Sequence, residues 1–520
     1  MNRMKMTPKS TMSGTRPNIL FILADDLSYR DLSCFGQVQF ETPNLDRLCQ
    51  TGLRFDNAYC GSPECAPSRG SLMTGLHMGH CRIRKNDSAR GQDHLLASDL
   101  TIAEVLKKAG YTTGMVGKWG IGLPDTEGTP DKKGFDLAFG FYDQGRAHTY
   151  YPHYLYHNSE PIPIPENYGF DMETTYQHTR TPAGLHVYDD EGQLIPHGVA
   201  DPKRAKNSED LCYQKAIDFI DQHHQQPFFL YYATQLPHGP CITSNLGQFK
   251  DRPWLQKHKE WASMITHLDR HVGGLLDRLR QYEIFDNTLI IFASDNGYAH
   301  WGYMGRQKYA DDPLFRNKGP WRGGKFIAWE GGVRIPMFVH WSGRISAGVS
   351  YHTVTLYDFF DTACDLAGVR NPPITDGISF LPTLENREAD QQKHDHLYWE
   401  NGGHATHAQA VCLDQWFAYR QHPNQPAQLW DTKNDIGGEH DVGAEHPDIV
   451  QRVLDVFDLE HQDSQWYLNP GESEESFQSK SQRAAELGEF QEGVRANTEY
   501  RGEAKSMEKI EVVVDPAIPD

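Results

Sequence analysis

Residues 18–26 read NILFILADD, seven uncharged and mostly apolar residues that run directly into Asp25 and Asp26. A continuous apolar run of this length predicts a strand buried on both faces, as in a parallel sheet. The same kind of run recurs at residues 111–117, 228–234, 288–293 and 337–341. Together these runs predict the strands of one large, mostly parallel sheet.

Helical patterns separate these runs. They cover residues 42–48, 101–109 and 255–281, and the first begins with a Thr cap followed by Pro43. Alternating strands and helices predict an α/β fold in which helices sandwich a mixed, mostly parallel sheet. We assign residues 17–385 to this catalytic domain.

The pattern changes after about residue 385, where short aromatic runs replace the long apolar ones. A smaller C-terminal α+β domain with an antiparallel sheet is predicted over residues 386–468. Its strands are expected at residues 397–400, 408–413, 416–420 and 428–431, with a hairpin at Asp414-Gln415 and a helix over 447–459. Residues 1–16 form an N-terminal extension, and the polar residues 469–520 form a tail.

Composition narrows the class of protein. A chain of 520 residues exceeds the usual single-domain size, and a formal charge of −20 argues against nucleic acid as a partner. No apolar run approaches the length of a membrane span. The nine cysteines are scattered without a CxxC pair, which fits neither a disulfide framework nor a zinc site. The first residues lack an apolar signal region, so the expected location is cytoplasmic, or periplasmic or secreted if a signal was removed.

Polar side chains follow four of the five apolar runs. They are Asp25-Asp26, Lys118, His238 and Asp295-Asn296. Ligands of open α/β sheets bind at the carboxyl ends of the strands, so we expect these side chains to share one active site. Asp25, Asp26, Asp295 and Asn296 form an all-oxygen set, which predicts a hard cation such as Ca²⁺ or Mg²⁺ rather than zinc.

Residues 65–75 read CAPSRGSLMTG and carry the most specific motif of the chain. Pro67 suits the first turn of a helix, which would set Cys65 at a helix N-terminus where anions are favoured. Arg69 adds a planar fork of donors that matches a tetrahedral oxyanion. This stretch resembles the signature of the type I sulfatases, in which the Cys is oxidised after translation to formylglycine.

Three further elements extend the resemblance to the sulfatases. Lys118 lies in a Gly-Lys-Trp element, His238 in Pro237-His238-Gly239-Pro240, and Lys325 in a Gly-Gly-Lys element. By motif the resemblance spans about residues 17 to 345, and more weakly reaches residue 470. It implies an alkaline phosphatase-like fold, maturation by a formylglycine-generating enzyme, and hydrolysis of a sulfate ester.

The resemblance also implies roles for the residues. The formylglycine hydrate would attack sulfur, and the four oxygen ligands would hold Ca²⁺, with Mg²⁺ as the other candidate. Arg69, Lys118 and Lys325 would stabilise charge on sulfate, and His238 would protonate the leaving alkoxide.

One position departs from the family pattern. Many sulfatases have His two residues after the Lys of the second element, where this chain has Gly120. That His is assigned to proton transfer or to sulfate contact. His148 follows soon after in an aromatic loop, and we predict that it takes over this role.

Two loop regions are candidates for substrate recognition, residues 142–157 and 300–322. Aromatic faces stack on sugar rings and arginines pair with anions, so Arg146, Trp301 and Arg322 are predicted to bind a sulfated sugar. The Gly-Lys-Trp-Gly variant is also similar to that of bacterial carbohydrate sulfatases. The sugar, the sulfate position and the oligomeric state are not determined by these patterns.

Two alternatives stay open. The first is a phosphodiester or phosphonate ester hydrolase of the same superfamily, although such enzymes often use more His ligands for a transition metal. The second is a non-catalytic protein that binds anionic glycans. The intact Cys65 motif and the intact carboxylates argue against the second alternative.

Overall fold

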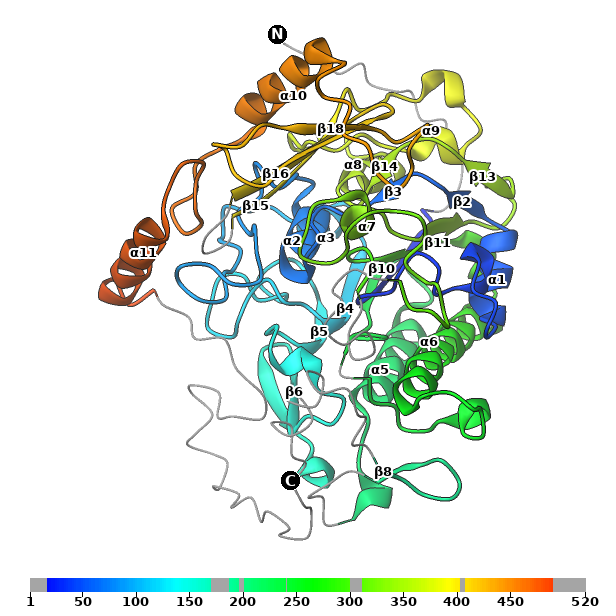
Figure 1. Cartoon of the computed structure of the whole chain (residues 1–520). Coiled ribbons are helices and arrows are strands. Elements are labelled where there is room, and N and C mark those ends of the chain that lie inside the picture. The colour runs from blue at the N-terminus through cyan, green and yellow to red at the C-terminus, as the bar shows by residue number, and fades with distance from the viewer. Residues whose placement is uncertain are drawn as a thin grey trace.

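The computed structural model describes residues 16–169, 187–195, 201–239, 241–299, 311–402 and 407–489. Within this part of the chain, ten strands form the central sheet (Figure 1), in the order β13-β2-β12-β11-β1-β10-β4-β5-β6-β7. Their bounds are β1 Asn18–Ala24, β2 Leu53–Phe55, β4 Thr112–Lys118, β5 Leu137–Phe141, β6 Tyr154–His157, β7 Glu160–Pro163, β10 Phe228–Ala233, β11 Thr288–Ser294, β12 Met337–His340 and β13 Gly348–Ser350.

The centre of this sheet is parallel. Strands β11, β1, β10, β4 and β5 run in the same direction, with Ile19 of β1 opposite both Phe229 and Leu289. Strand β12 is antiparallel to both of its neighbours, β11 and β2. The apolar run of β12 predicts a strand that is buried on both faces. An interior strand is buried in this way whether it runs parallel or antiparallel to its neighbours, so the run alone does not predict the direction of β12.

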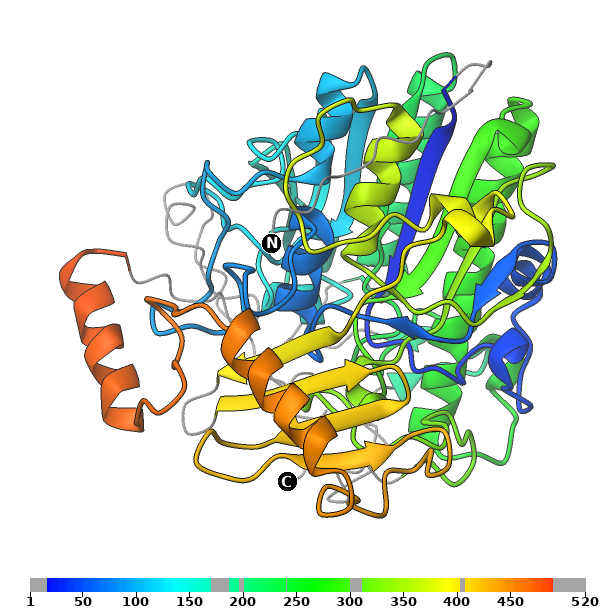
Figure 2. The same cartoon turned by 90° about the horizontal axis from the view of Figure 1, so that it is seen from above.

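Helices cover both faces of the sheet (Figure 2). On β1, Ile19, Phe21 and Leu23 pack in one core with α2, α3 and α8, whereas Leu20 and Ile22 pack in a second core with α1, α5 and α6. This alternation follows from the two-residue period of a strand. The bounds of these helices are α1 Pro43–Gln50, α2 Cys65–Thr74, α3 Ile102–Lys108, α5 Ser208–His223, α6 Gln256–Gln281 and α8 Asp358–Ala367.

A second sheet follows near the C-terminus. Four antiparallel strands in the order β15-β16-β17-β18 pack against α10, seen in orange in Figure 2. Asp414 and Gln415 connect β16 to β17, and Asp414 has a positive φ of 51°, as a tight hairpin requires. The bounds are β15 Leu397–Gly402, β16 His407–Leu413, β17 Trp416–Arg420, β18 Gln428–Asp431 and α10 Pro447–Glu460. The predicted fold class is confirmed.

Part of the predicted polar tail is helical. Helix α11 spans Glu474–Glu486, and its Phe477 and Ala484 are buried in a small cluster with Ala89 and Trp466. Only these two apolar residues, seven positions apart, pack this helix against the rest of the protein. Two apolar residues are too few to give a helical pattern in an otherwise polar sequence.

The remaining strands and α-helices of the described residues are short. They are β3 Ala58–Tyr59 paired with β14 Val354–Thr355, β8 Val187–Tyr188 paired with β9 Leu194–Ile195, α7 Glu330–Val333 and α9 Leu381–Leu384. Among the helices of the described segments, none has the length and apolar character needed to cross a bilayer.

Candidate active site

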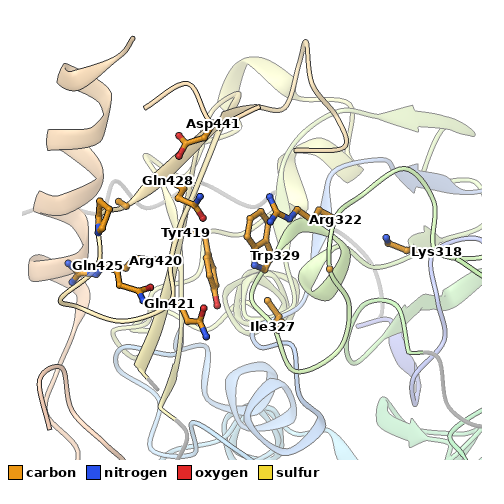
Figure 3. Close-up of a pocket in the computed structure, with 13 residues that line it drawn as sticks. Lys318, Arg322, Ile327, Trp329, Tyr419, Arg420, Gln421, Gln425, Gln428 and Asp441 are labelled. Carbon is orange, nitrogen blue, oxygen red and sulfur yellow. The ribbon is translucent and has the colours of Figure 1, made fainter. Parts of the chain in front are cut away.

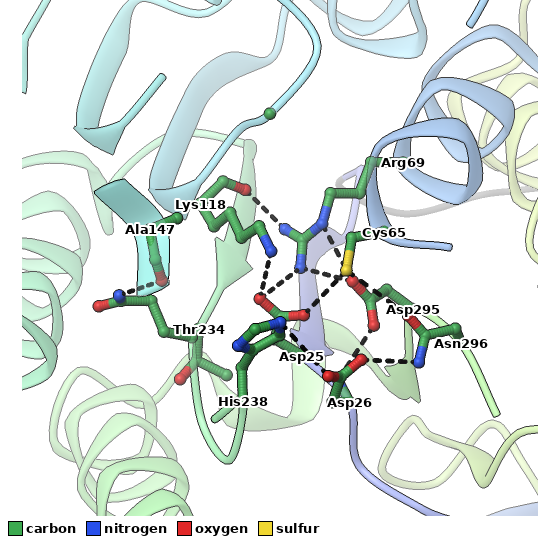
Figure 4. A network of polar contacts seen from close by, with 12 residues as sticks. Asp25, Asp26, Cys65, Arg69, Lys118, Ala147, Thr234, His238, Asp295 and Asn296 are labelled. Atoms are coloured by element: carbon green, nitrogen blue, oxygen red, sulfur yellow. Dashed lines mark hydrogen bonds and ion pairs between the residues drawn. The ribbon is translucent and has the colours of Figure 1, made fainter. Parts of the chain in front are cut away.

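Neighbouring parallel strands deliver the polar side chains to one edge of the sheet. Asp25 and Asp26 follow β1, Asp295 and Asn296 follow β11, Lys118 ends β4, and His238 lies beyond β10. These strands are adjacent in the order β11-β1-β10-β4, so their carboxyl ends meet. Figure 4 shows the resulting network, to which Cys65 and Arg69 are added from α2.

Cys65 is the first residue of α2 and lies at the centre of this network. Its side chain is fully buried, and its sulfur lies 3.0 Å from Lys325 Nζ, 3.5 Å from Asp25 Oδ1 and 3.6 Å from Asn296 Oδ1. Burial raises the pKa of the Cys65 thiol, an effect that the nearby lysines only partly offset. A thiol in this environment is not the low-pKa kind that serves as a nucleophile.

Arg69 lies one turn further along α2 and is also fully buried. Its Nε and Nη2 donate to Asp295 Oδ2 at 3.2 and 2.8 Å, and Nη1 donates to the Lys118 carbonyl at 2.6 Å. Asp295 Oδ1 accepts from the Asp26 amide at 3.1 Å. Burial and the charge of Asp25 raise the pKa of Asp295 to about 6, in spite of its contact with Arg69.

Two lysines complete the cationic side of the network. Lys118 Nζ lies 2.8 Å from Asp25 Oδ2, and Lys325 Nζ lies 2.6 Å from Asp26 Oδ1. Burial works against ionisation of Asp25, but the surrounding cations, Lys118 foremost, outweigh it and hold the pKa of Asp25 well below its ordinary value. The buried charges among these residues balance, with three carboxylates (Asp25, Asp26, Asp295) facing three cations (Arg69, Lys118, Lys325).

Two histidines stack beside the network. The rings of His148 and His238 are 4.2 Å apart and nearly parallel, at 5°. His238 Nδ1 contacts the Gly239 carbonyl, and His238 Nε2 lies 3.4 Å from Lys325 Nζ and 3.3 Å from Asp26 Oδ2. Burial lowers the pKa of both rings. His148 is thus brought to the site through His238.

The oxygen set fits a hard cation. Asp26 Oδ2 is buried and accepts no hydrogen bond from the described residues, although His238 Nε2 lies 3.3 Å away. Asp25 Oδ1 and Asn296 Oδ1 face the same space beside the Cys65 sulfur. Asp26 also has a positive φ of 63°, an uncommon conformation for a non-glycine residue and one that is found at functional sites. A ligand set made of carboxylate and amide oxygens suits Ca²⁺ or Mg²⁺.

The structure explains why Gly occupies position 120. Gly120 has a φ of +78°, and a Cβ there would lie 2.1 Å from Gln144 Nε2, which donates to the Gly120 carbonyl at 3.2 Å. A histidine at this position would need both a strained backbone and a displaced Gln144. This backbone therefore disfavours the histidine found at this position in many sulfatases.

The predicted substrate-binding residues lie in different environments. Arg146 is fully buried, stacks on the Tyr154 ring and donates to the Tyr154 carbonyl, and its Nη1 forms an ion pair with Asp143 Oδ2 at 3.9 Å. Arg322 is exposed and lies over the Trp329 ring. Trp301 lies outside the described residues. The substrate-binding roles of these three residues stay predictions.

Glu64 and Asn401 support the site and were not singled out in the sequence. Asn401 of β15 donates to Glu64 Oε1 at 3.0 Å and to the Phe326 carbonyl at 3.2 Å. Glu64 precedes Cys65, and Phe326 follows Lys325. One side chain of the C-terminal sheet thus holds the residues next to both Cys65 and Lys325, a long-range contact with no local sequence signal.

Comparisons with known proteins agree with this arrangement. The model of the family described as Sulfatase matches residues 17–369, and that described as N-sulphoglucosamine sulphohydrolase, C-terminal, matches residues 321–451. The chain is 28% identical to N-acetylgalactosamine-6-O-sulfatase of Bacteroides thetaiotaomicron, with 87% of this chain and 95% of that protein covered. It is 33% identical to human N-acetylgalactosamine-6-sulfatase, with 71% of this chain but only 66% of the human protein covered.

Solved structures extend the comparison. The structure titled Ps i-CgsB in complex with k-i-k-neocarrahexaose has a TM-score of 0.68 and 26% identity to this chain. The alignment covers 92% of this chain and 100% of that one.

Proposed function

Because the chain belongs to the sulfatase family, we propose that it hydrolyses the sulfate ester of a carbohydrate to an alcohol and inorganic sulfate. One observation carries the proposal. The Cys65 sulfur lies within 3.6 Å of Lys325 Nζ, Asp25 Oδ1 and Asn296 Oδ1, inside a fully buried network of three carboxylates and three cations. Such a network suits an anionic ester next to a metal ion.

Residue 65 is proposed to act as formylglycine, made by oxidation of the thiol by a formylglycine-generating enzyme. Its hydrated aldehyde supplies an oxygen nucleophile for sulfur and a route by which sulfate leaves afterwards. The sequence CAPSR at residues 65–69 supports this maturation. The buried, unactivated thiol would be a poor nucleophile without it.

Asp25, Asp26, Asp295 and Asn296 are proposed to hold Ca²⁺, with Mg²⁺ as the other candidate. The cation would polarise sulfate oxygen and lower the pKa of a bound hydroxyl. Asp25 Oδ1 and Asn296 Oδ1 face the Cys65 sulfur, and Asp26 Oδ2 accepts no hydrogen bond from the described residues. Asp295 is already engaged by Arg69, so its role is partly to orient that guanidinium.

The remaining residues bind charge and move protons. Arg69, Lys118 and Lys325 surround the Cys65 position and would stabilise the equatorial oxygens of sulfate as the S–O bond to the sugar breaks. His238, whose Nε2 lies 3.4 Å from Lys325 Nζ, would protonate the leaving alkoxide. His148, stacked on His238, would take a proton when sulfate is released.

The substrate class is proposed to be a sulfated sugar. N-acetylgalactosamine 6-sulfate is the first compound to test, because relatives from a bacterium and from human are named for this sulfatase activity. The exposed Arg322 and the aromatic residues around it add a cationic surface near the site.

The test measures the turnover of three compounds by the matured protein, namely N-acetylgalactosamine 6-sulfate, an aryl sulfate and an aryl phosphate diester. We expect both sulfate esters to release sulfate. Turnover of the diester alone would contradict the proposal and favour the phosphoesterase alternative. Glycan binding without any turnover would favour a non-catalytic protein.

A further inference from the structure

A large pocket lies between the loop 318–329, which also carries Lys325 of the candidate active site, and strands β17 and β18 (Figure 3). Its volume is about 940 Å³. Pockets for small ligands occupy roughly 300–1,000 Å³, so this one is large enough for a sugar unit. It is lined by polar and aromatic side chains from both sides, with Arg322 and Trp329 on one side and Tyr419 and Gln428 on the other.

Three cations line this pocket, Lys318, Arg322 and Arg420, and Arg322 is the most exposed of them. Aromatic rings fix its orientation. The guanidinium carbon lies 3.8 Å from the centre of the Trp329 ring and 5.5 Å from that of Trp430, and Nη1 donates to the Gly438 carbonyl at 3.1 Å. Stacking on an aromatic face leaves the edge of a guanidinium available for planar anions. Arg322 is therefore preorganised to donate to a carboxylate or a sulfate.

No carboxylate of the described segments forms an ion pair with Arg322. Asp441 also lines the pocket, but its Oδ1 accepts from the amides of Leu429 and Gly443 at 3.1 and 2.9 Å. The carboxylate thus serves the turn after β18. In a chain with a formal charge of −20, an arginine that pairs with no carboxylate of the described segments is a local centre of positive charge.

Three exposed glutamines share the rim of the pocket, Gln421, Gln425 and Gln428. Each side-chain amide offers both donors and an acceptor, the combination that sugar hydroxyls require. The pocket therefore combines three cations, Lys318, Arg322 and Arg420, with several adaptable amides.

The wall of the pocket and the active-site lysine belong to the same loop. Gly323 and Ile327 line the pocket, and Lys325 between them reaches the Cys65 sulfur at 3.0 Å. Phe326 has a positive φ of 75°, and its amide donates to the Pro63 carbonyl at 2.9 Å. A strained, tethered loop of this kind keeps a fixed spacing between the pocket and residue 65.

We propose that this pocket binds a second, anionic sugar unit, next to the one whose sulfate is cleaved, so that the protein acts on sulfated oligosaccharides in preference to monosaccharides. The proposal rests on the proposed sulfatase function. Arg322 pairs with the carboxylate or sulfate of the second unit, and Gln421, Gln425 and Gln428 bind its hydroxyls.

The experiment compares oligosaccharides of alternating uronic acid and N-acetylgalactosamine 6-sulfate with the sulfated monosaccharide. For the matured wild-type protein we expect kcat/KM to rise about 10-fold or more from monosaccharide to tetrasaccharide, as a charge-assisted hydrogen bond would give. Arg322→Ala and Gln428→Ala should each reduce this gain in kcat/KM. Arg344→Ala is the matched control, because Arg344 is exposed and also lies over a tryptophan, Trp341, but outside the pocket.

Binding is measured separately on Cys65→Ala protein by calorimetry with the tetrasaccharide and with its chemically desulfated form, which keeps the carboxylate. We expect Arg322→Ala in the same background to weaken binding of the sulfated tetrasaccharide about 10-fold. A similar loss on Arg322→Ala for the desulfated form would identify the carboxylate as the group that pairs with Arg322, and a loss confined to the sulfated form would identify the sulfate. A wild-type protein that turns over all substrates without any chain-length preference, or an equal loss in Arg344→Ala, would overturn the proposal. Absence of all sulfate turnover would instead refute the sulfatase function, and the binding measurement would still decide on the pocket.

Discussion

The ammonium nitrogen of Lys325 lies 3.0 Å from the sulfur of Cys65, although 260 positions separate the two residues in the chain. The same nitrogen lies 2.6 Å from Asp26 Oδ1 and 3.4 Å from His238 Nε2. Lys325 therefore contacts the proposed nucleophile, a proposed metal ligand and the proposed general acid at once. This position makes it the cation best placed to stabilise charge that develops on sulfate.

Lys325→Met is expected to lower kcat by about 10²–10³, the range found when a preorganised donor to a developing anion is removed. The change also removes the cationic partner of the buried Asp26 carboxylate, so we expect a loss of roughly 3–5 kcal/mol in the free energy of unfolding. Urea denaturation and steady-state kinetics on an aryl sulfate measure the two effects. Lys107→Met, at an exposed pair with Asp136, is the control. Full turnover by Lys325→Met would show that this lysine is not part of the chemistry.

Asp26→Asn is expected to weaken Ca²⁺ binding and turnover together, by more than 10-fold, since it removes one of the charged ligands. The backbone should tolerate the change, because asparagine adopts the positive φ of 63° found at Asp26. Calorimetric titration of chelator-treated protein with Ca²⁺ measures the binding. Asp56→Asn, at a partly exposed pair with Arg54, serves as the control. Zinc bound through histidine in the wild-type protein would contradict the assignment of the site.

His148→Ala is expected to reduce turnover at least 10-fold, because it removes a base from the site. His148→Phe separates two roles, since phenylalanine keeps a ring stacked on His238 but cannot accept a proton. If His148 moves a proton, both variants are impaired and their pH–rate profiles change shape. Recovery of turnover in His148→Phe would assign His148 to positioning His238 instead.

Glu400 is expected to make folding stability depend on pH in the acid range. Burial opposes its ionisation, but its contacts with His407, His461 and Arg84 outweigh burial and lower the pKa of Glu400 from its ordinary value of 4.5. A carboxyl whose folded pKa is depressed contributes stability above the unfolded pKa and loses it as pH falls through the folded pKa.

Wild-type protein should therefore lose stability below about pH 4.5 more steeply than Glu400→Gln. At pH 7 the variant should be less stable by roughly 3–5 kcal/mol, because Arg84 stays buried without its carboxylate. Denaturant titrations between pH 3 and 7 test both statements, and parallel curves for the two proteins would refute the account of Glu400.

The long apolar runs before Asp25, Lys118 and Asp295 were sufficient to predict the strands and the edge at which their polar residues meet. This is because a strand buried on both faces has a strong local signal and a defined carboxyl end. The hairpin at Asp414 was likewise predictable, because it depends on residues that are adjacent in the sequence. By contrast, the direction of β12 depends on its neighbours, and the burial of Arg146 against Tyr154 depends on tertiary packing.

The long-range contacts that hold the active-site residues in place could not be predicted from the sequence either. Asn401 reaches both Glu64 and Phe326 only because the C-terminal sheet lies against the start of α2, and nothing in the residues around Asn401 indicates this contact. The return of the chain at Lys325 depends on the positive φ of Phe326, a conformation that bulky residues rarely adopt and that sequence patterns therefore do not predict.

The most direct test measures the chemical state of residue 65 and the turnover of a sulfate ester on the same samples. Protein is produced with increasing amounts of formylglycine-generating enzyme, the peptide that contains Cys65 is analysed by mass spectrometry, and aryl sulfate turnover is determined. We predict that turnover rises in proportion to the fraction of peptide that carries the aldehyde, and that Cys65→Ser is folded but inactive in a host that converts only cysteine. Full turnover by protein whose peptide carries only the unmodified thiol would contradict the formylglycine mechanism.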